Sequence, residues 1–189
     1  MAGSMTSPPG LERLREFVNT RDIEAGTDVL ATAEEGTAWL HDRGLLDAGE
    51  PLQPDGIERI VRFREIIRDA LTANHDAAGL PSRVRDGLNE AIRRARLAPE
   101  IGARGVAMRP SKSGADGAIG MLLVPMLEAM TSGTWDRLKV CGNDACRWAF
   151  YDQSRSKGRK WCSMAVCGNR AKQDTWRASR SGASRQPTE

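Results

Sequence analysis

Membrane spans and export signals are both missing from this 189-residue sequence. No stretch approaches the roughly 18 uninterrupted apolar residues of a transmembrane helix. The first ten residues have neither the basic segment nor the apolar segment of a secretory signal. These absences exclude a membrane-spanning chain and predict a cytoplasmic protein.

The residues of common catalytic sites are equally scarce. The sequence has two histidines, His41 and His75, and neither has a carboxylate or cysteine at a spacing suited to a shared metal. Gly114, Gly117 and Gly120 lack the lysine that a phosphate-binding loop requires. With no acid/base pair in view, we expect that the protein is not an enzyme.

The overall composition is that of an ordinary globular protein. Apolar residues make up 40% of the chain and charged residues 28%, which excludes global disorder and a fibrous repeat. The length suits a domain of about 140 residues with a small module attached. We predict a helical domain at 5–137, a zinc module at 138–180 and a loose tail at 181–189.

Helical periodicity dominates the first 137 residues. Apolar residues recur at intervals of three and four, between proline-containing or capping starts and glycine or proline stops. In 32–44, Thr32 and Glu35 form a capping box before Trp39 and Leu40. This periodicity fails between 103 and 113, where a short strand is expected. Helices are predicted at 7–18, 32–44, 55–79, 81–99 and 116–133. The predicted fold class is mainly α, a multi-helical N-terminal domain with at most a small strand pair, plus a C-terminal four-cysteine zinc module.

All four cysteines lie within 27 residues, at Cys141, Cys146, Cys162 and Cys167. Each pair encloses four residues and fifteen residues separate the pairs, a spacing typical of a four-cysteine zinc site. Such a small segment buries too little apolar surface to fold alone, and structural zinc supplies the missing free energy. Disulfides and redox or catalytic cysteines are the alternatives. Four thiolates fill a tetrahedral shell, so one structural Zn²⁺ per chain is predicted.

The residues around the cysteines favour a treble-clef-like module. Gly142-Asn143 and Gly168-Asn169 permit tight turns beside the ligands. The first pair is expected to form a knuckle, and a helix is expected to begin near Cys167.

Positive charge is concentrated in the same part of the chain. Up to Arg137 there are 17 Lys and Arg against 21 Asp and Glu, whereas from Leu138 there are 11 against 4. Such asymmetry is typical of a polyanion-binding end. We therefore predict duplex DNA as the partner. The candidate contacts are Arg147, Arg155, Lys157, Arg159, Lys160, Arg170, Lys172, Arg177 and Arg180.

Two alternatives to DNA binding stay open. Some cations, especially Arg159 and Arg170, are also suited to bracing the fold. For Arg170 the two roles are equally favoured, whereas for the run 155–160 binding is favoured. If the module only packs against the helical domain, the protein would be a zinc-stabilised adaptor for an acidic protein. If Tyr151 and Trp176 are partly exposed, base stacking on them favours RNA. Trp148, Phe150 and Trp161 flank cysteines and are expected in the small core of the module.

A small-molecule effector site is a further hypothesis for the helical domain. Polar side chains beside an apolar helix face and two arginines one turn apart motivate it. The candidate residues are Asn19, Trp39, Arg64 and Arg68. Ordinary capping and surface arginines are the alternative explanation. The helical domain is also a candidate for homodimerisation.

The segment from Cys141 to Lys172 resembles the CGNR zinc-finger family. The motif of that family stands here as Cys167-Gly168-Asn169-Arg170. Further matched positions are Trp148, Phe150, Asp152, Ser154, Arg159, Trp161, Cys162 and Met164.

The preceding part resembles the ABATE domain, a stress-induced transcription regulator that usually accompanies this finger. The matching stretches are 17–20, the helix after Thr32 and Asp116-Gly117. The two resemblances together imply a bacterial, zinc-containing and DNA-binding protein.

Overall fold

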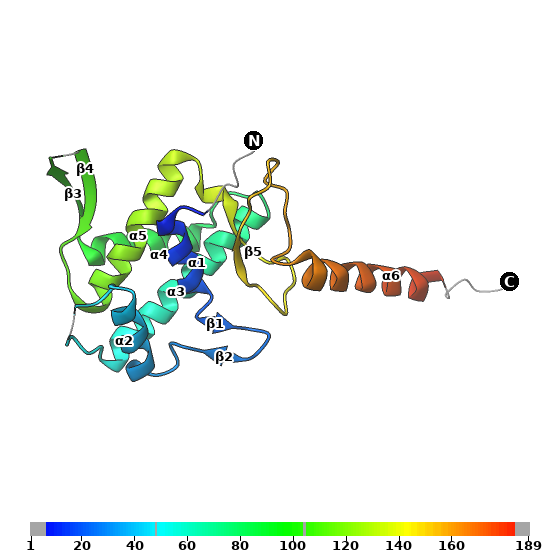
Figure 1. Ribbon diagram of the computed structural model, residues 1–189, viewed down its shortest axis with the longest axis horizontal. Coiled ribbons are helices and arrows are strands. Elements are labelled where there is room, and N and C mark those ends of the chain that lie inside the picture. The colour runs from blue at the N-terminus through cyan, green and yellow to red at the C-terminus, as the bar shows by residue number, and fades with distance from the viewer. Residues whose placement is uncertain (1–6, 48, 104, 184–189) are drawn as a thin grey trace.

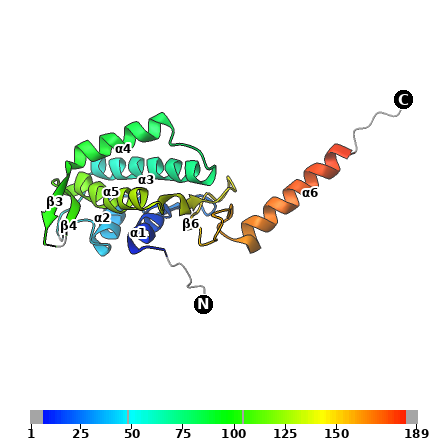
Figure 2. The ribbon, with the colours of Figure 1, turned by 90° about the horizontal axis from the view of Figure 1, so that it is seen from above.

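Five helices form the N-terminal part of the protein in a computed structural model that describes residues 7–47, 49–103 and 105–183, with side chains to residue 180. We call these helices the helical body. They are α1 (Pro9–Val18), α2 (Ala33–Asp42), α3 (Pro54–His75), α4 (Ser82–Ala95) and α5 (Gly114–Ser132). Helices α3 and α5 lie in the middle, with α4 on one side and α1 and α2 on the other (Figure 2).

The described strands form three small antiparallel pairs. Strand β1 (Arg21–Asp22) pairs with β2 (Thr27–Asp28), and β3 (Leu97–Gly102) pairs with β4 (Gly105–Pro110). The third pair, β5 (Leu138–Val140) with β6 (Ala149–Tyr151), follows a 3-10 turn at Trp135–Arg137. The predicted mainly α fold class is confirmed, but the helical domain has two small strand pairs, β1–β2 and β3–β4, where at most one was expected.

The helix-end signals in the sequence act largely as predicted. Thr32 accepts a hydrogen bond from the backbone N–H of Glu35 at the start of α2. Gly44 and Gly133 follow α2 and α5 with φ of 62° and 71°, the left-handed conformation that glycine adopts without steric cost.

Several predicted helix boundaries are wrong, including the start of α5, which is at Gly114 instead of 116. Helix α3 begins at Pro54, and Asp55 pairs with Arg59 inside the first turn rather than capping it. It ends at His75 instead of 79, just before Ala77 takes a positive φ. Helix α4 ends at Ala95 because Arg96 is left-handed, so 97–99 belong to β3.

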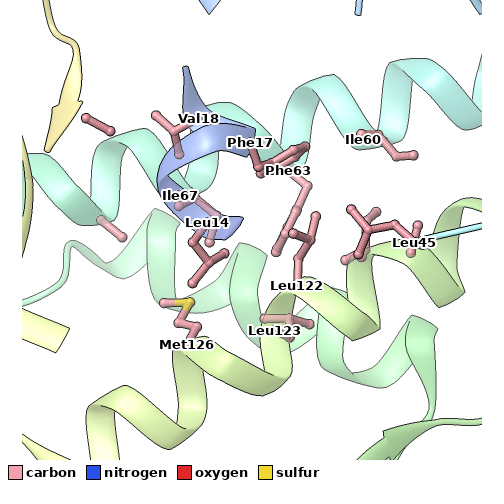
Figure 3. Close-up of a cluster of buried hydrophobic side chains, with 14 of the residues drawn as sticks. Leu14, Phe17, Val18, Leu45, Ile60, Phe63, Ile67, Leu122, Leu123 and Met126 are labelled. Atoms are coloured by element: carbon pink, nitrogen blue, oxygen red, sulfur yellow. The ribbon is translucent and has the colours of Figure 1, made fainter. Parts of the chain in front are cut away.

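A single apolar core joins the helical body to the start of the cysteine-rich segment. Leu14 and Phe17 of α1 point toward Phe63 of α3 and Leu122 of α5 (Figure 3). The same cluster contains Leu138, Val140, Ala149 and Tyr151 of β5 and β6. The apolar core therefore continues across residue 137.

The last helix, α6 (Asn169–Ala183), projects away from the rest of the molecule (Figure 1). Of the tail predicted at 181–189, residues 181–183 form the end of α6 and 184–189 lie outside the described residues. No helix in the described ranges combines the length and apolarity needed to cross a bilayer.

Candidate metal centre and nucleic-acid interface

The four cysteines come together from three short segments. Cys141 follows β5 directly, and Cys146 closes the turn that returns the chain to β6. Cys162 lies in the following loop, and Cys167 lies in a π-helical turn, Met164–Gly168, that leads into α6. Their four Sγ atoms all lie within 4.8 Å of one another. The predicted knuckle from the first pair and helix after the second are confirmed.

The sulfur positions fit one zinc ion. The Sγ atoms of Cys146 and Cys162 are 3.7 Å apart, as are those of Cys162 and Cys167. Four sulfurs at about 2.3 Å from a tetrahedral zinc are about 3.8 Å from one another. Cys141, Cys146 and Cys167 are buried, and Cys162 is partly exposed. These four residues can hold a structural zinc with no coordination position left for a substrate.

The electrostatics of the cluster also require a cation. Burial raises the pKa of Cys146 to about 11 and raises the pKa of Cys162. Burial opposes ionisation of Cys141 as well, but hydrogen bonds from the backbone N–H groups of Cys162 and Asn143 lower its pKa. Four thiols this close cannot all ionise without a compensating charge, and a dication supplies it.

The first ligand turn is shaped by close packing against the end of α3. A Cβ on Gly142 would lie 2.8 Å from the ring of His75 and 3.2 Å from Trp161. Asn143 then accepts hydrogen bonds on its backbone oxygen from the N–H groups of Cys146 and Arg147. Only glycine lets the turn approach α3 this closely. The contact with His75 is absent from our sequence-based predictions because nothing in residue spacing links position 75 to 142.

The second ligand turn leads directly into α6. The Ser163 hydroxyl accepts a hydrogen bond from the N–H of Val166, and the Ser163 carbonyl accepts one from Gly168. Cys167 therefore lies in the turn that immediately precedes the N-terminus of α6.

Two tryptophans complete the small core of the module. Trp148 and Trp161 pack against the buried cysteines as predicted. Phe150 is also buried and lies under the Arg159 guanidinium, 5.1 Å from ring centroid to Cζ. Tyr151, expected to be partly exposed, is buried in the core of the helical body.

A buried ion pair organises the loop after β6. Asp152 accepts hydrogen bonds from Lys139 Nζ, the Ser154 hydroxyl and the N–H of Arg159. Burial would raise the pKa of Asp152, but these hydrogen bonds hold it below the usual aspartate value. Asp152 and Lys139 support the metal site indirectly, because they hold the loop that leads to Cys162. Asp152 is one of the positions that match the CGNR family, whereas no feature of the sequence pointed to Lys139.

Two residues predicted for a ligand pocket, Asn19 and Arg68, instead connect the body to the module. Asn19 makes two hydrogen bonds with the backbone of Ala149, one as donor and one as acceptor. Arg68 is 2% exposed and donates to the carbonyls of Val18 and Arg147. Both side chains act as struts between α1, α3 and the knuckle.

The other two residues of that predicted pocket, Arg64 and Trp39, are also held by protein contacts. Arg64 is fully buried and makes a bidentate pair with Asp28, at 2.6 and 2.8 Å. Trp39 is buried against Phe17, with the Arg43 guanidinium 4.2 Å above its ring. Protein contacts thus hold all four side chains, and the alternative of surface arginines is wrong because Arg64 and Arg68 are buried.

In the basic loop predicted to bind DNA, residues 155–160, two of the cations make contacts within the protein. Arg159 donates to the carbonyls of Trp161 and Cys162. Lys157 pairs with Asp136 at 2.6 Å. Arg155 and the side chain of Lys160 are exposed and have no ion pair with any described residue.

Arg147 and Arg170 are tied to the body as well. Arg147 donates to the Thr72 hydroxyl and lies 3.7 Å from Asp69 of α3. Arg170, in the first turn of α6, pairs with Glu24 of the β1–β2 turn at 2.5 Å. Bracing, left open as an alternative for Arg170, is one role that the structure gives it.

The remaining cations lie on the projecting helix α6 (Figure 2). Lys172, Arg177 and Arg180 are exposed. Arg177 lies 3.5 Å from Asp174, and Arg180 lies over the ring of Trp176, which is 58% exposed. The structure thus divides the predicted contacts into braced cations beside the zinc site and exposed cations on the loop and α6.

Two family models match the chain. Residues 14–132 match the ABATE model, described as a putative stress-induced transcription regulator. Residues 137–180 match the CGNR zinc finger model. The order of the two matches is the one predicted from the sequence. A comparison with curated proteins finds no match.

Proposed function

Because this chain belongs to the ABATE family and ends in a CGNR zinc finger, we propose that it is a transcription regulator that binds duplex DNA through α6. The zinc has a structural role in this proposal, since four thiolates complete its shell. The helical body acts as the sensor or dimerisation part.

The projection of α6 is the observation that carries the proposal (Figure 1). A helix of 15 residues is about 22 Å long, and the major groove of B-DNA admits one helix. Arg170, Gln173 and Arg177 follow the i, i+3, i+7 spacing of a single helix face, and Arg180 continues it. This face offers guanidinium and amide groups, which read base edges in the major groove.

The exposed loop cations supply a second kind of contact. Arg155 and Lys160 precede the second ligand pair and have no ion pair among the described residues. We assign them to phosphate contacts, which position a protein on the duplex without reading sequence. Lys157 contributes only if DNA displaces Asp136.

The test compares three double variants in fluorescence-anisotropy titrations of duplex DNA over a salt series. Arg177→Ala/Arg180→Ala should weaken binding to a selected site by about 10- to 100-fold, as expected for base-reading arginines. Arg155→Ala/Lys160→Ala should weaken binding to all sequences and reduce the salt slope by about two.

The matched control is Arg85→Ala/Arg93→Ala, which removes two exposed arginines from α4. It should leave the affinity unchanged. If all three double variants bind equally well, α6 is not the DNA-binding element and the proposal is wrong.

RNA binding is the second candidate, because Trp176 exposes more than half of its surface on the same helix. An exposed indole stacks on unpaired bases. Competition among duplex DNA, single-stranded RNA and heparin distinguishes the two. Preference for RNA, abolished by Trp176→Ala, would favour the second candidate, and binding to none of the three would favour a protein-interaction adaptor.

A further inference from the structure

A cavity of about 240 Å³ lies in the helical body, and none of the cysteines lines it. It is lined by residues of α3 and α4, and by the first turns of α5. Its apolar part consists of Phe63, Ile66 and Ile119. These side chains otherwise belong to, or pack against, the main core.

Small residues of α4 face this apolar part. Gly87 approaches α3 so closely that a Cβ would lie 2.8 Å from Cδ1 of Ile66. One turn later, Ala91 also lines the cavity with a short side chain. Gly87 lets α4 pack directly against Ile66, and the short side chain of Ala91 leaves part of the apolar surface between α3 and α4 uncovered where it lines the cavity.

The rim of the cavity carries hydrogen-bond donors that the protein does not fully use. The Nε atom of Arg59 is buried and has no hydrogen-bond partner among the described residues, since Asp116 Oδ1 is 3.6 Å away. Arg62 is exposed and only loosely paired with Glu58, at 3.5 Å. Because this Nε atom is itself buried, a ligand would reach Arg59 at the rest of its guanidinium group, whose side chain is 27% exposed.

The acidic groups at the rim are already partnered. Asp116 accepts hydrogen bonds from Arg94 at 3.2 and 3.4 Å. Glu90 accepts hydrogen bonds from its neighbour Arg93. Three arginines and two acidic residues line the cavity, so its charged lining is positive by one and favours a carboxylate.

We propose that this cavity binds a small monocarboxylate with an apolar body, such as an aromatic or short aliphatic acid. The apolar body would contact Phe63, Ile66 and Ile119, and the carboxylate would accept hydrogen bonds from Arg59 and Arg62. A ligand site of this kind combines an apolar lining with a few convergent polar groups. Its role as an effector depends on the proposed regulator function, whereas binding itself does not.

The experiment is a calorimetric titration of the zinc-loaded full-length chain with benzoate and with hexanoate. Benzyl alcohol and hexanol serve as uncharged probes of the same shape. The acids should bind saturably, and the alcohols should bind at least about tenfold more weakly. Equal binding of acids and alcohols, or no saturable binding up to about 10 mM acid, would overturn the proposal.

Variants locate the site. Ala91→Leu fills the cavity and should weaken acid binding by about tenfold or more. Asn89→Leu places the same leucine side chain at an exposed position of α4 and should leave binding unchanged. If Ala91→Leu does not fold, Arg62→Gln at the exposed rim tests the carboxylate contact and should weaken binding several-fold.

Unchanged binding in the folded cavity variants would overturn the location. The DNA titrations test α6 and the basic loop, whereas the acid titrations test the cavity. A failure of one proposal can therefore be distinguished from a failure of the other. The variants Arg177→Ala/Arg180→Ala should bind benzoate as the parent does.

Discussion

The helical body and the zinc module are stabilised by different physical means. The body buries leucine, isoleucine and phenylalanine side chains from all five helices in one cluster. The zinc module, taken as residues 141–168, has a cluster of its own that consists of four cysteines and two tryptophans. Burial of apolar surface therefore stabilises the body, whereas the module depends on the metal and on its attachment to α3.

That attachment combines the apolar packing of β5 and β6 against the body with specific polar contacts. Asn74 donates to the carbonyls of Trp135 and Leu138, and Arg68 donates to the carbonyl of Arg147. The His75 ring packs against Gly142. One face of α3 thus supports the knuckle, and the finger is built as an extension of the body.

Zinc removal should give the largest difference between the two regions. Structural zinc contributes about 10–16 kcal/mol in small fingers at neutral pH. On chelation, or in Cys162→Ser, amides of 142–147, 153–168 and α6 should exchange rapidly with deuterium, because the ligand loops lose the metal and an isolated helix of this length is marginal. Amides of α3 and α5 should stay protected.

The control for this experiment is Ser156→Ala in the exposed loop, which should retain one zinc per chain and normal exchange. Simultaneous loss of protection in α3 and α5 would show that the body has no independent stability. The contrast between a body stabilised by apolar burial and a module stabilised by metal would then fail.

A truncated side chain in the body core should have the opposite effect: it should destabilise the body and leave zinc binding unchanged. Leu122 of α5 is fully buried in the main cluster. Leu122→Ala should lower the free energy of unfolding by about 3–5 kcal/mol. The zinc content of the folded protein should not change. Urea denaturation at constant excess zinc, with metal analysis of the folded fraction, checks both; reduced zinc content would indicate that the core and the metal site are coupled.

The fold was predictable where local signals and tertiary packing agree. The five periodic segments correspond to helices α1 to α5. Thr32, Gly44 and Gly133 mark helix ends as predicted. The ends of α3 and α4 were not predictable, because non-glycine residues take the left-handed conformation at Ala77 and Arg96. Sequence propensity gives no signal for such positions.

The candidate site was predictable only for its metal ligands. Cysteine spacing alone identified the four ligands, because zinc fixes both their number and their separation. The roles of arginines could not be separated by composition. Arg64 and Arg177 are the same residue type, yet one is buried against Asp28 and the other lies on an exposed helix. Long-range partners decide this difference, and residue spacing does not encode them.

Removing a strut between the two regions should have an intermediate effect. Arg68→Met deletes the donors for the Val18 and Arg147 carbonyls and the pair with Glu65. Loss of one partner of a buried pair costs about 3–5 kcal/mol, and because Glu65 is partly exposed we expect about 2–3 kcal/mol. Urea denaturation measures this loss of stability.

The exchange data sharpen this prediction. In Arg68→Met, the knuckle amides around Arg147 should lose more protection than those of α5, because the lost contacts lie at the joint. Arg83→Met removes an exposed arginine that pairs with Asp69 and should change stability by less than about 1 kcal/mol. Equal effects of the two substitutions would contradict a structural role for the buried strut.

The smallest effect concerns Asp28, which pairs with Arg64 within the body. Burial acts to raise the pKa of Asp28, but hydrogen bonds from Arg64 and from the backbone N–H of Leu30, together with the charges of Arg64 and Arg21, outweigh it and the pKa is lowered. A carboxyl with a lowered pKa in the folded state contributes stability above its unfolded pKa of about 3.9, and this contribution disappears as the pH falls through the folded value. Asp28→Asn should therefore cost about 1–2 kcal/mol near neutral pH and progressively less below pH 4. Because acid also releases zinc by protonating thiolates, the measured quantity is the difference in unfolding free energy between parent and variant at each pH. A difference that stays constant down to pH 3 would mean that the Asp28 charge does not stabilise the body, and that apolar burial alone accounts for this region.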